Sequence, residues 1–187
     1  MGPDPFSRRL RSEAELISNS TLLEAAGRRF DASVLNPFTG GASLQTPSVR
    51  VLVADDFAPW RRLLHSILQD KPELTVICEV SDGLEAVQKA RELQPDLIIL
   101  DIGLPSLSGI EAARQIRTIV PKAKILFVSE NYSIDIAKST LSAGGSGYVI
   151  KSDAGSELLT AVETVFLGRQ FVSARLTAQS TPGITGN

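Results

Sequence analysis

The segment Asp96-Leu97-Ile98-Ile99-Leu100-Asp101 places four large aliphatic residues in a row between two aspartates. Two of the four are β-branched, and such a short apolar run is typical of a strand buried on both faces of a parallel sheet. Pro105 and Gly109 follow closely, so we expect the chain to turn just after Asp101. Asp101 then lies at the carboxyl end of a strand, where open parallel sheets bind ligands. An aspartate at this position can equally cap the next helix, and both roles stay open.

Strand and helix patterns alternate on both sides of this segment. We expect strands at 49–54, 74–80, 97–100, 125–128 and 148–150, and helices at 59–69, 83–93, 110–119, 134–143 and 158–167. In the first helix, the inner side is expected to carry Trp60, Leu63, Leu64, Ile67 and Leu68. Such alternation predicts a parallel sheet with helices on both faces, because each right-handed crossover lies over one face. The predicted fold class is α/β, a flavodoxin-like (βα)5 doubly wound sheet with strand order 2-1-3-4-5.

Composition divides the chain into three parts. Residues 1–48 form a leader and linker: two capping-box patterns favour short helices before residue 31, and Pro, Gly and Ser then favour a loop. This leader is either a docking or dimerising helix or a mobile tail. Residues 49–172 form the folded domain, and residues 173–187, rich in Thr, Gly and Ser, form a flexible C-terminal tail.

Charge and hydropathy exclude several classes of function. The net charge of −2 argues against a general nucleic-acid binder. No apolar run reaches the length needed to span a membrane, so we expect a cytoplasmic protein. Cys78 is the only cysteine, which rules out an internal disulfide, and it lies in an apolar run that suits a small core residue.

Polar side chains converge on one edge of the predicted sheet. The first strand ends at Asp55 and Asp56, and the third, fourth and fifth strands end at Asp101, Ser129 and Lys151. Three acids in close quarters repel one another unless cations offset their charge. Lys151 supplies one positive charge, and Mg²⁺, which prefers carboxylate, carbonyl and water ligands, is expected to supply the rest.

These strand-end residues, together with Leu104-Pro105, Gly109 and Tyr148, resemble the receiver domain of bacterial two-component response regulators over about residues 49–172. The resemblance implies that a sensor histidine kinase or a histidine phosphotransfer protein phosphorylates Asp101. A second copy of the chain is a further candidate partner. The protein is expected to be a signalling switch that catalyses only its own phosphorylation and dephosphorylation.

The resemblance also implies roles for the neighbours of Asp101. Asp56, Asp101 and the backbone carbonyl of Gly103 are expected to bind Mg²⁺ directly, and Asp55 to act through water. Lys151 neutralises charge, and the Ser129 hydroxyl donates to a phosphoryl oxygen after transfer. Ser129 then moves toward Asp101, and the ring of Tyr148 turns inward from solvent. The surface of helix 134–143, strand 148–150 and helix 158–167 changes shape as a result.

The sequence departs from the family pattern at three places. Ser152 follows Lys151, where many receivers have proline, and Gly103 offers no side chain toward an attacking water. The run Gly147-Tyr-Val-Ile-Lys-Ser152, with Gly168 and Phe171-Val172, is most similar to NarL/FixJ-type receivers, which usually carry a helix-turn-helix domain. Residues 173–187 are too few for that domain, so we expect no DNA binding by this chain.

Rival functions fail on single residues. A flavodoxin needs a neutral, hydroxyl-rich loop after its first strand, but this sequence has Asp55-Asp56-Phe57. A haloacid-dehalogenase-type phosphatase needs a second aspartate two residues after its nucleophile, where this chain has Gly103. A receiver-like docking module that works without phosphate remains the alternative. Two minor candidates have ordinary interpretations: Gly144–Gly147 precedes a strand and so forms a turn, and His65 is a partly exposed helical residue.

Overall fold

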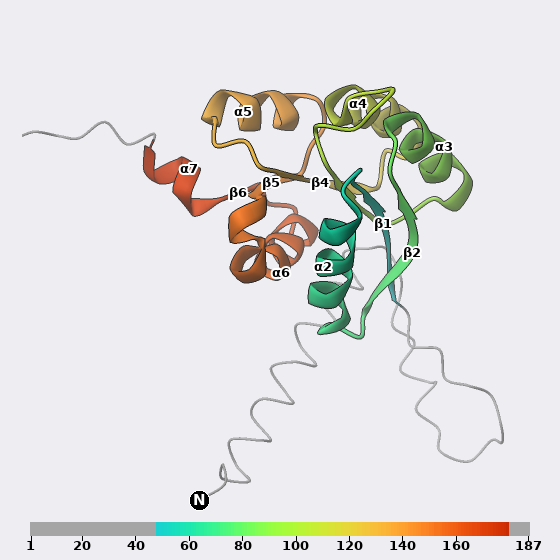
Figure 1. Ribbon diagram of the computed structural model, residues 1–187, viewed down its shortest axis with the longest axis horizontal. Helices are drawn as coiled ribbons and strands as arrows, with labels where there is room; N and C mark the ends of the chain where they lie inside the picture. Colours follow the sequence, from blue (N-terminus) through green and yellow to red (C-terminus); the bar gives the residue numbers. More distant parts are fainter. Residues whose placement is uncertain (1–47, 180–187) are drawn as a thin grey trace, which may run out of the picture.

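Six parallel strands form one sheet in the order β2-β1-β3-β4-β5-β6 (Figure 1). The computed structural model describes residues 48–179. The strands are β1 (Val49–Ala54), β2 (Leu74–Val80), β3 (Leu97–Leu100), β4 (Lys124–Ser129), β5 (Gly147–Ile150) and β6 (Phe171–Val172). The predicted flavodoxin-like fold and the order 2-1-3-4-5 are confirmed, and the short strand β6 extends the sheet by pairing with β5.

Helices cover both faces of the sheet. They are α2 (Ala58–Gln69), α3 (Gly83–Leu93), α4 (Gly109–Ile119), α5 (Ile134–Ser142), α6 (Ala154–Phe166) and α7 (Ala174–Gln179), with a 3-10 turn, η2 (Lys151–Asp153). Figure 1 shows α3, α4 and α5 on one face, and α2 and α6 on the other.

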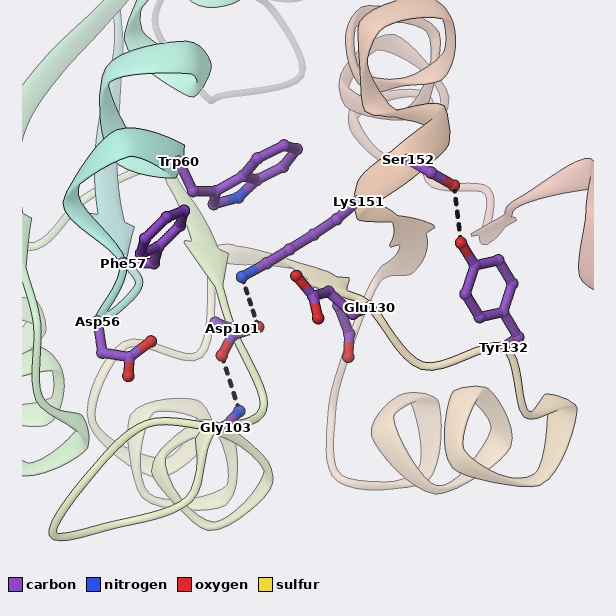
Figure 2. Close-up of a pocket in the computed structure, with 10 residues that line it drawn as sticks. Asp56, Phe57, Trp60, Asp101, Gly103, Glu130, Tyr132, Lys151 and Ser152 are labelled. Carbon is purple, nitrogen blue, oxygen red and sulfur yellow. Dashed lines mark hydrogen bonds and ion pairs between the residues drawn. The ribbon is translucent and has the colours of Figure 1, made fainter.

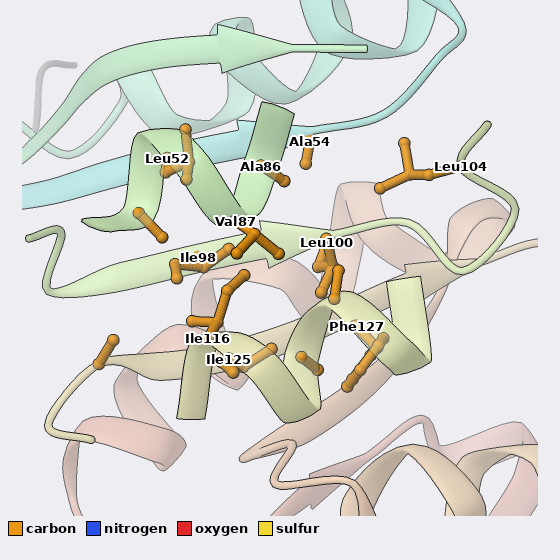
Figure 3. Packing of buried hydrophobic residues seen from close by; sticks show 14 of the residues in the cluster. Leu52, Ala54, Ala86, Val87, Ile98, Leu100, Leu104, Ile116, Ile125 and Phe127 are labelled. Carbon is orange, nitrogen blue, oxygen red and sulfur yellow. The ribbon is translucent and has the colours of Figure 1, made fainter. Parts of the chain in front are cut away.

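Two apolar layers hold the helices on the sheet. Because successive side chains of a strand point to opposite faces, Leu52 of β1 packs into the layer beneath α3 and α4. Its neighbour Val53 packs into the layer shared with α2 and α6. Figure 3 shows Leu52 and Ile98 from adjacent strands in the first layer, near Ile116 of α4. All four residues of β3 are buried, as the apolar run predicts.

Two details of the predicted helices differ from the structure. Leu63 was expected on the inner side of α2, but its side chain is 47% exposed. It lies about 100° around the helix from the buried Leu64, at the edge of the apolar stripe. Helix α6 begins at Ala154 rather than at residue 158, because its first turn carries small and polar residues that apolar periodicity does not mark.

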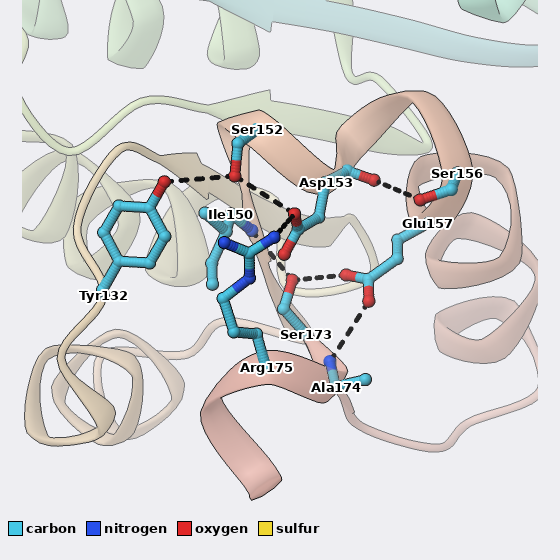
Figure 4. Close-up of polar contacts among 9 residues, drawn as sticks. All are labelled: Tyr132, Ile150, Ser152, Asp153, Ser156, Glu157, Ser173, Ala174 and Arg175. Carbon is cyan, nitrogen blue, oxygen red and sulfur yellow. Dashed lines mark hydrogen bonds and ion pairs between the residues drawn. The ribbon is translucent and has the colours of Figure 1, made fainter. Parts of the chain in front are cut away.

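The expected flexible tail from residue 173 is wrong for residues 173–179. Ser173 and Leu176 are fully buried, Leu176 packs into the apolar layer beneath α3 to α5, and Figure 1 shows α7 next to β6 at the edge of the sheet. The Ser173 hydroxyl accepts a hydrogen bond from the Ile150 N–H at 2.9 Å and donates to a Glu157 carboxylate oxygen at 2.5 Å (Figure 4). The other Glu157 oxygen accepts from the N–H of Ala174 at 3.2 Å. Composition suggested a solvated tail, but these partners come from distant elements.

A second set of contacts joins α7 to the loop after β4. Arg175 forms an ion pair of 2.7 Å with Asp153, and its guanidinium lies over the Tyr132 ring at 5.7 Å (Figure 4). The Tyr132 hydroxyl donates to Ser152 at 3.1 Å. These contacts link the start of α7 to the turn η2 and to the loop between β4 and α5.

Residues 1–47 and 180–187 lie outside the described residues, and so do most of the predicted leader and the end of the predicted tail. Within residues 48–179, no helix is both long enough and apolar enough to cross a membrane.

Candidate functional site

The carboxyl ends of the strands open into a pocket of about 660 Å³ (Figure 2). It lies where the strand order reverses between β1 and β3, the usual ligand site of such sheets. The residues that line it come from the ends of β3 and β4, the loops after β1, β3 and β4, the first turn of α2 and the turn η2: Asp56, Phe57, Trp60, Asp101, Gly103, Ser129, Glu130, Tyr132, Lys151 and Ser152. The predicted site residues Asp56, Asp101, Gly103, Ser129 and Lys151 are therefore brought together.

Lys151 bridges two buried carboxylates at the base of this pocket. Its Nζ lies 2.6 Å from Asp55 Oδ2 and 3.3 Å from Asp101 Oδ1. Asp55 is only 1% exposed and Asp101 7% exposed, so both carboxylates are largely removed from water. Strand ends that are far apart in the sequence thus place a cation directly between two anions.

Burial and the neighbouring charges act in opposite directions on the pKa of Asp55 and on that of Lys151. Burial raises the pKa of Asp55, and the Lys151 ammonium and the Phe57 N–H only partly offset that effect. Burial lowers the pKa of Lys151, but its hydrogen bond to Asp55 and the charge of Asp101 outweigh that and raise it above the ordinary value. Lys151 is therefore a firmly protonated cation at neutral pH.

Asp101 is held at the end of β3 by backbone groups. Its N–H donates to the carbonyl of Ala54 at 2.8 Å, and its Oδ2 accepts from the N–H of Gly103 at 2.8 Å. The capping role considered for Asp101 is wrong, since Ser108 accepts from the N-terminus of α4 instead. Gly109 is required behind the site, because a Cβ there would lie 1.8 Å from the carbonyl oxygen of Asp101.

The three acids of the rim occupy different environments. Asp55 is paired with Lys151, whereas Asp56 is exposed and lines the pocket with Asp101 and Gly103. Within residues 48–179, no group of three or more His, Cys, Asp or Glu side chains is arranged to hold a metal ion. Mg²⁺ typically binds one or two carboxylates and completes its shell with water and phosphate oxygens. The donor set of Asp56, Asp101 and backbone oxygen fits that mode of binding.

Ser129 and Tyr148 are linked through the loop after β4. The Ser129 hydroxyl accepts from the N–H of Asn131 at 3.2 Å, and the Tyr148 hydroxyl donates to the carbonyl of Asn131 at 2.8 Å. The Tyr148 ring was expected to start in solvent, but it is fully buried. Its ring packs in the core beneath α3 to α5, and burial raises the pKa of its hydroxyl.

The sequence did not predict several aromatic and polar residues of the pocket as site residues. Phe57, Glu130 and Tyr132 line the pocket with Ser152, yet none ends a strand. Each lies within a few residues of a strand end. Their position in the loops that follow the strands is the sequence signal that could have predicted them, because such loops often carry binding residues. Trp60 was expected on the inner side of α2, and its ring lies over the Lys151 ammonium at 5.4 Å.

The minor candidates keep their ordinary interpretations. His65 lies 3.2 Å from Glu79 of β2 and away from the pocket. Cys78 is partly buried against the core, and burial raises the pKa of its thiol. Gly144–Gly147 joins α5 to β5 as a turn, in which Gly144 adopts a positive φ of 103° that favours glycine.

Comparison with known proteins agrees with this geometry. The model of the response regulator receiver domain matches residues 51–163. Over 131 residues the chain is 34% identical to the transcriptional regulatory protein LnrK of Bacillus subtilis, a match that covers 70% of this chain and 60% of LnrK. This chain spans about 60% of the length of the curated relatives it matches.

Solved structures show the same relationship. A LuxR-family two-component response regulator from Aurantimonas sp. SI85-9A1 superposes with a TM-score of 0.67 at 33% identity, over 70% of this chain and 94% of that one. The response regulator domain of Thermotoga maritima CheB gives a TM-score of 0.60 at 32% identity, over 64% of this chain and 97% of that one. A buried aspartate, a lysine bridge and this fold occur together in a chain that belongs to the family of response regulator receiver domains of two-component systems.

Proposed function

We propose that Asp101 accepts a phosphoryl group from a phosphohistidine of a sensor histidine kinase or a histidine phosphotransfer protein. The observation that supports this most directly is the contact of 3.3 Å between Lys151 Nζ and Asp101 Oδ1 at the base of an open pocket. The Gly103 N–H holds the other carboxylate oxygen, Oδ2. One oxygen is thus fixed by the backbone and the other lies beside a cation.

Transfer follows from this placement. An oxygen of Asp101 forms a bond to phosphorus while the P–N bond of the donor breaks. The electron pair of that bond stays on the imidazole nitrogen of the donor, which takes up a proton. Phosphoryl transfer depends mainly on positioning and charge neutralisation, and Lys151 provides both at the accepting oxygen.

The acidic pocket residues repel an anionic phosphoryl group unless a cation offsets their charge. We expect Asp56, Asp101 and the backbone carbonyl of Gly103 to hold Mg²⁺, with Asp55 acting through water. When bound, the ion neutralises charge on the phosphoryl oxygens. Asp55 has a second role in this chain, because it anchors Lys151 at 2.6 Å. It keeps the ammonium near Asp101 before the donor arrives.

Readout is proposed to begin at Ser129. A phosphoryl group on Asp101 offers new acceptor oxygens, and the Ser129 hydroxyl donates to one of them. That movement disturbs the contact of Ser129 with the Asn131 N–H, and so the carbonyl that holds the Tyr148 hydroxyl. The surface of α5, β5 and α6 then changes the binding of a partner or of a second copy of the chain.

Asp101→Asn tests the assignment. The protein is incubated with acetyl phosphate and Mg²⁺, and the bound phosphate is measured by intact mass. We expect the phosphate adduct to disappear in Asp101→Asn and to persist in the control Asp135→Asn, whose side chain is 86% exposed on α5. Equal phosphate uptake by the Asp101 variant contradicts the proposal. A wild type that takes up no phosphate yet binds its partner supports a docking module that works without phosphate.

A further inference from the structure

Trp60 contacts the lysine of the site through the face of its indole ring. We infer that Trp60 is a positioning residue that holds the Lys151 ammonium beside Asp101. The Nζ atom lies 5.4 Å from the ring centroid, within the range of a cation–π interaction. The inference rests on the proposed role of Asp101 and assigns a function to a residue of α2.

Lys151 needs a support besides its carboxylates. It follows β5, and its long side chain crosses the base of the pocket toward the end of β3 (Figure 2). Asp55 and Asp101 attract the ammonium from their own side. The Trp60 ring lies against the same ammonium from α2. Contacts from the ends of β1 and β3 and from α2 therefore fix the position of the Lys151 ammonium.

An aromatic ring suits this position better than a third acid. The ring face attracts a cation but carries no net charge, so it does not repel an anionic phosphoryl donor. It also accepts no strong hydrogen bond, and an ammonium has three N–H donors. With two donors used by Asp55 and Asp101, one remains for an incoming phosphoryl oxygen.

Trp60 is itself held firmly. Pro59 lies in the first turn of α2, and the N–H of Trp60 donates to the carbonyl of Phe57 at 2.9 Å. The ring packs partly against the apolar layer shared by α2 and α6. Its buried Nε1–H has no hydrogen-bond partner among the described residues, so a hydrogen bond does not explain the ring orientation. Packing and the contact with Lys151 account for it.

The composition of the chain allows a selective test. Trp60 is the only tryptophan, so biosynthetic incorporation of fluorinated tryptophans changes this ring alone. Added fluorine withdraws charge from the ring face while the packing shape stays nearly the same. We compare unmodified, 5-fluoro and 5,6,7-trifluoro protein with Trp60→Phe and Trp60→Leu. The readouts are the rate of Asp101 phosphorylation by acetyl phosphate with Mg²⁺ and the melting temperature.

The expected result is a graded loss of rate without a matching loss of stability. From the unmodified to the trifluoro protein, the rate should fall by about two- to tenfold, as the strength of such contacts predicts. Trp60→Phe should keep more of the rate than Trp60→Leu, because only phenylalanine retains a ring face.

Two results overturn the inference. Equal rates across the fluorinated series show that the ring only fills space, and so do rates that fall strictly in parallel with the melting temperature. These failures differ from a failure of the proposed function. An unmodified protein that takes up no phosphate on Asp101 overturns both, whereas a phosphorylated protein that is insensitive to fluorination overturns this inference alone.

Discussion

Replacement of Lys151 should lower the free energy of unfolding, because its ammonium offsets the charge of two buried carboxylates. In Lys151→Met, the buried Asp55 and Asp101 carboxylates lose their shared cation. Removing one partner of a buried ion pair costs about 3 to 5 kcal/mol. Asp55 can escape by taking up a proton, and for a carboxyl with an ordinary pKa of 3.8 this costs about 4 kcal/mol at pH 7. We therefore expect the free energy of unfolding to fall by about 3 to 4 kcal/mol.

The loss depends on pH in a defined direction. In the variant, burial holds the pKa of Asp55 above its unfolded value, with no ammonium to oppose it. Between these two pKa values the folded state binds a proton that the unfolded state has released, so folding becomes less favourable as pH rises. Because the pKa of Asp55 is already raised in the wild type, the difference in stability between the two proteins should grow as pH rises above that wild-type pKa toward the higher pKa of the variant, and shrink as pH falls below it.

Urea unfolding followed by far-UV circular dichroism measures this difference at pH 7 and near pH 5. Lys138→Met is the matched control, because its side chain is 70% exposed and its Nζ forms only a long ion pair, of 3.9 Å, with the exposed Asp135. The control should change stability by about 0.5 kcal/mol or less. Adding Asp55→Asn to Lys151→Met should restore most of the lost stability. A loss no larger than that of the control, or no recovery in the double variant, refutes the buried-charge argument.

Three further predictions use other contacts. Ser173→Ala leaves the Ile150 N–H and a Glu157 oxygen without their shared partner. Thermal unfolding should therefore show that the free energy of unfolding falls by about 1 to 3 kcal/mol. An unchanged melting temperature contradicts the docked position of α7. Asp56→Ala should weaken Mg²⁺ binding about tenfold or more, measured by metal-dependent Trp60 fluorescence, and equal affinity removes Asp56 from the ligand set. Ser129→Ala should still accept phosphate on Asp101 but change the NMR signals of β5 less on beryllofluoride binding, and a full response would exclude the hydroxyl as the relay.

The sequence supported the prediction of the sheet because β1, β3, β4 and β5 are almost entirely buried apolar runs. The polar residues that directly follow those runs, Asp55, Asp101, Ser129 and Lys151, were therefore placed at one edge and are found there. Their pairing was less predictable, since it depends on side-chain geometry. Lys151 Nζ lies closer to Asp55 than to Asp101, and Asp56 is the exposed acid of the pocket.

Other features depend on partners that are distant in the sequence. Phe171–Val172 is too short to mark a strand by pattern, and its position is set by pairing with β5. The composition around Ser173 predicts a solvated tail, whereas its hydroxyl bonds to Glu157 and to the Ile150 N–H, which are distant in the sequence. The Tyr148 ring packs in the core beneath α3 to α5, and its hydroxyl donates to the carbonyl of Asn131, a contact that no local sequence pattern reports.

The most direct test of the account locates the phosphoryl group itself. The wild-type protein is phosphorylated by a histidine kinase or acetyl phosphate with Mg²⁺, and borohydride then reduces the acyl phosphate to an alcohol. Peptide mass spectrometry reads the modified position, with Asp55 and Asp56 in the same digest as internal controls. We predict conversion of Asp101 to homoserine and no conversion of the other two aspartates. Reduction at Asp55 or Asp56, or an intact Asp101 in protein that carries phosphate, contradicts the central claim.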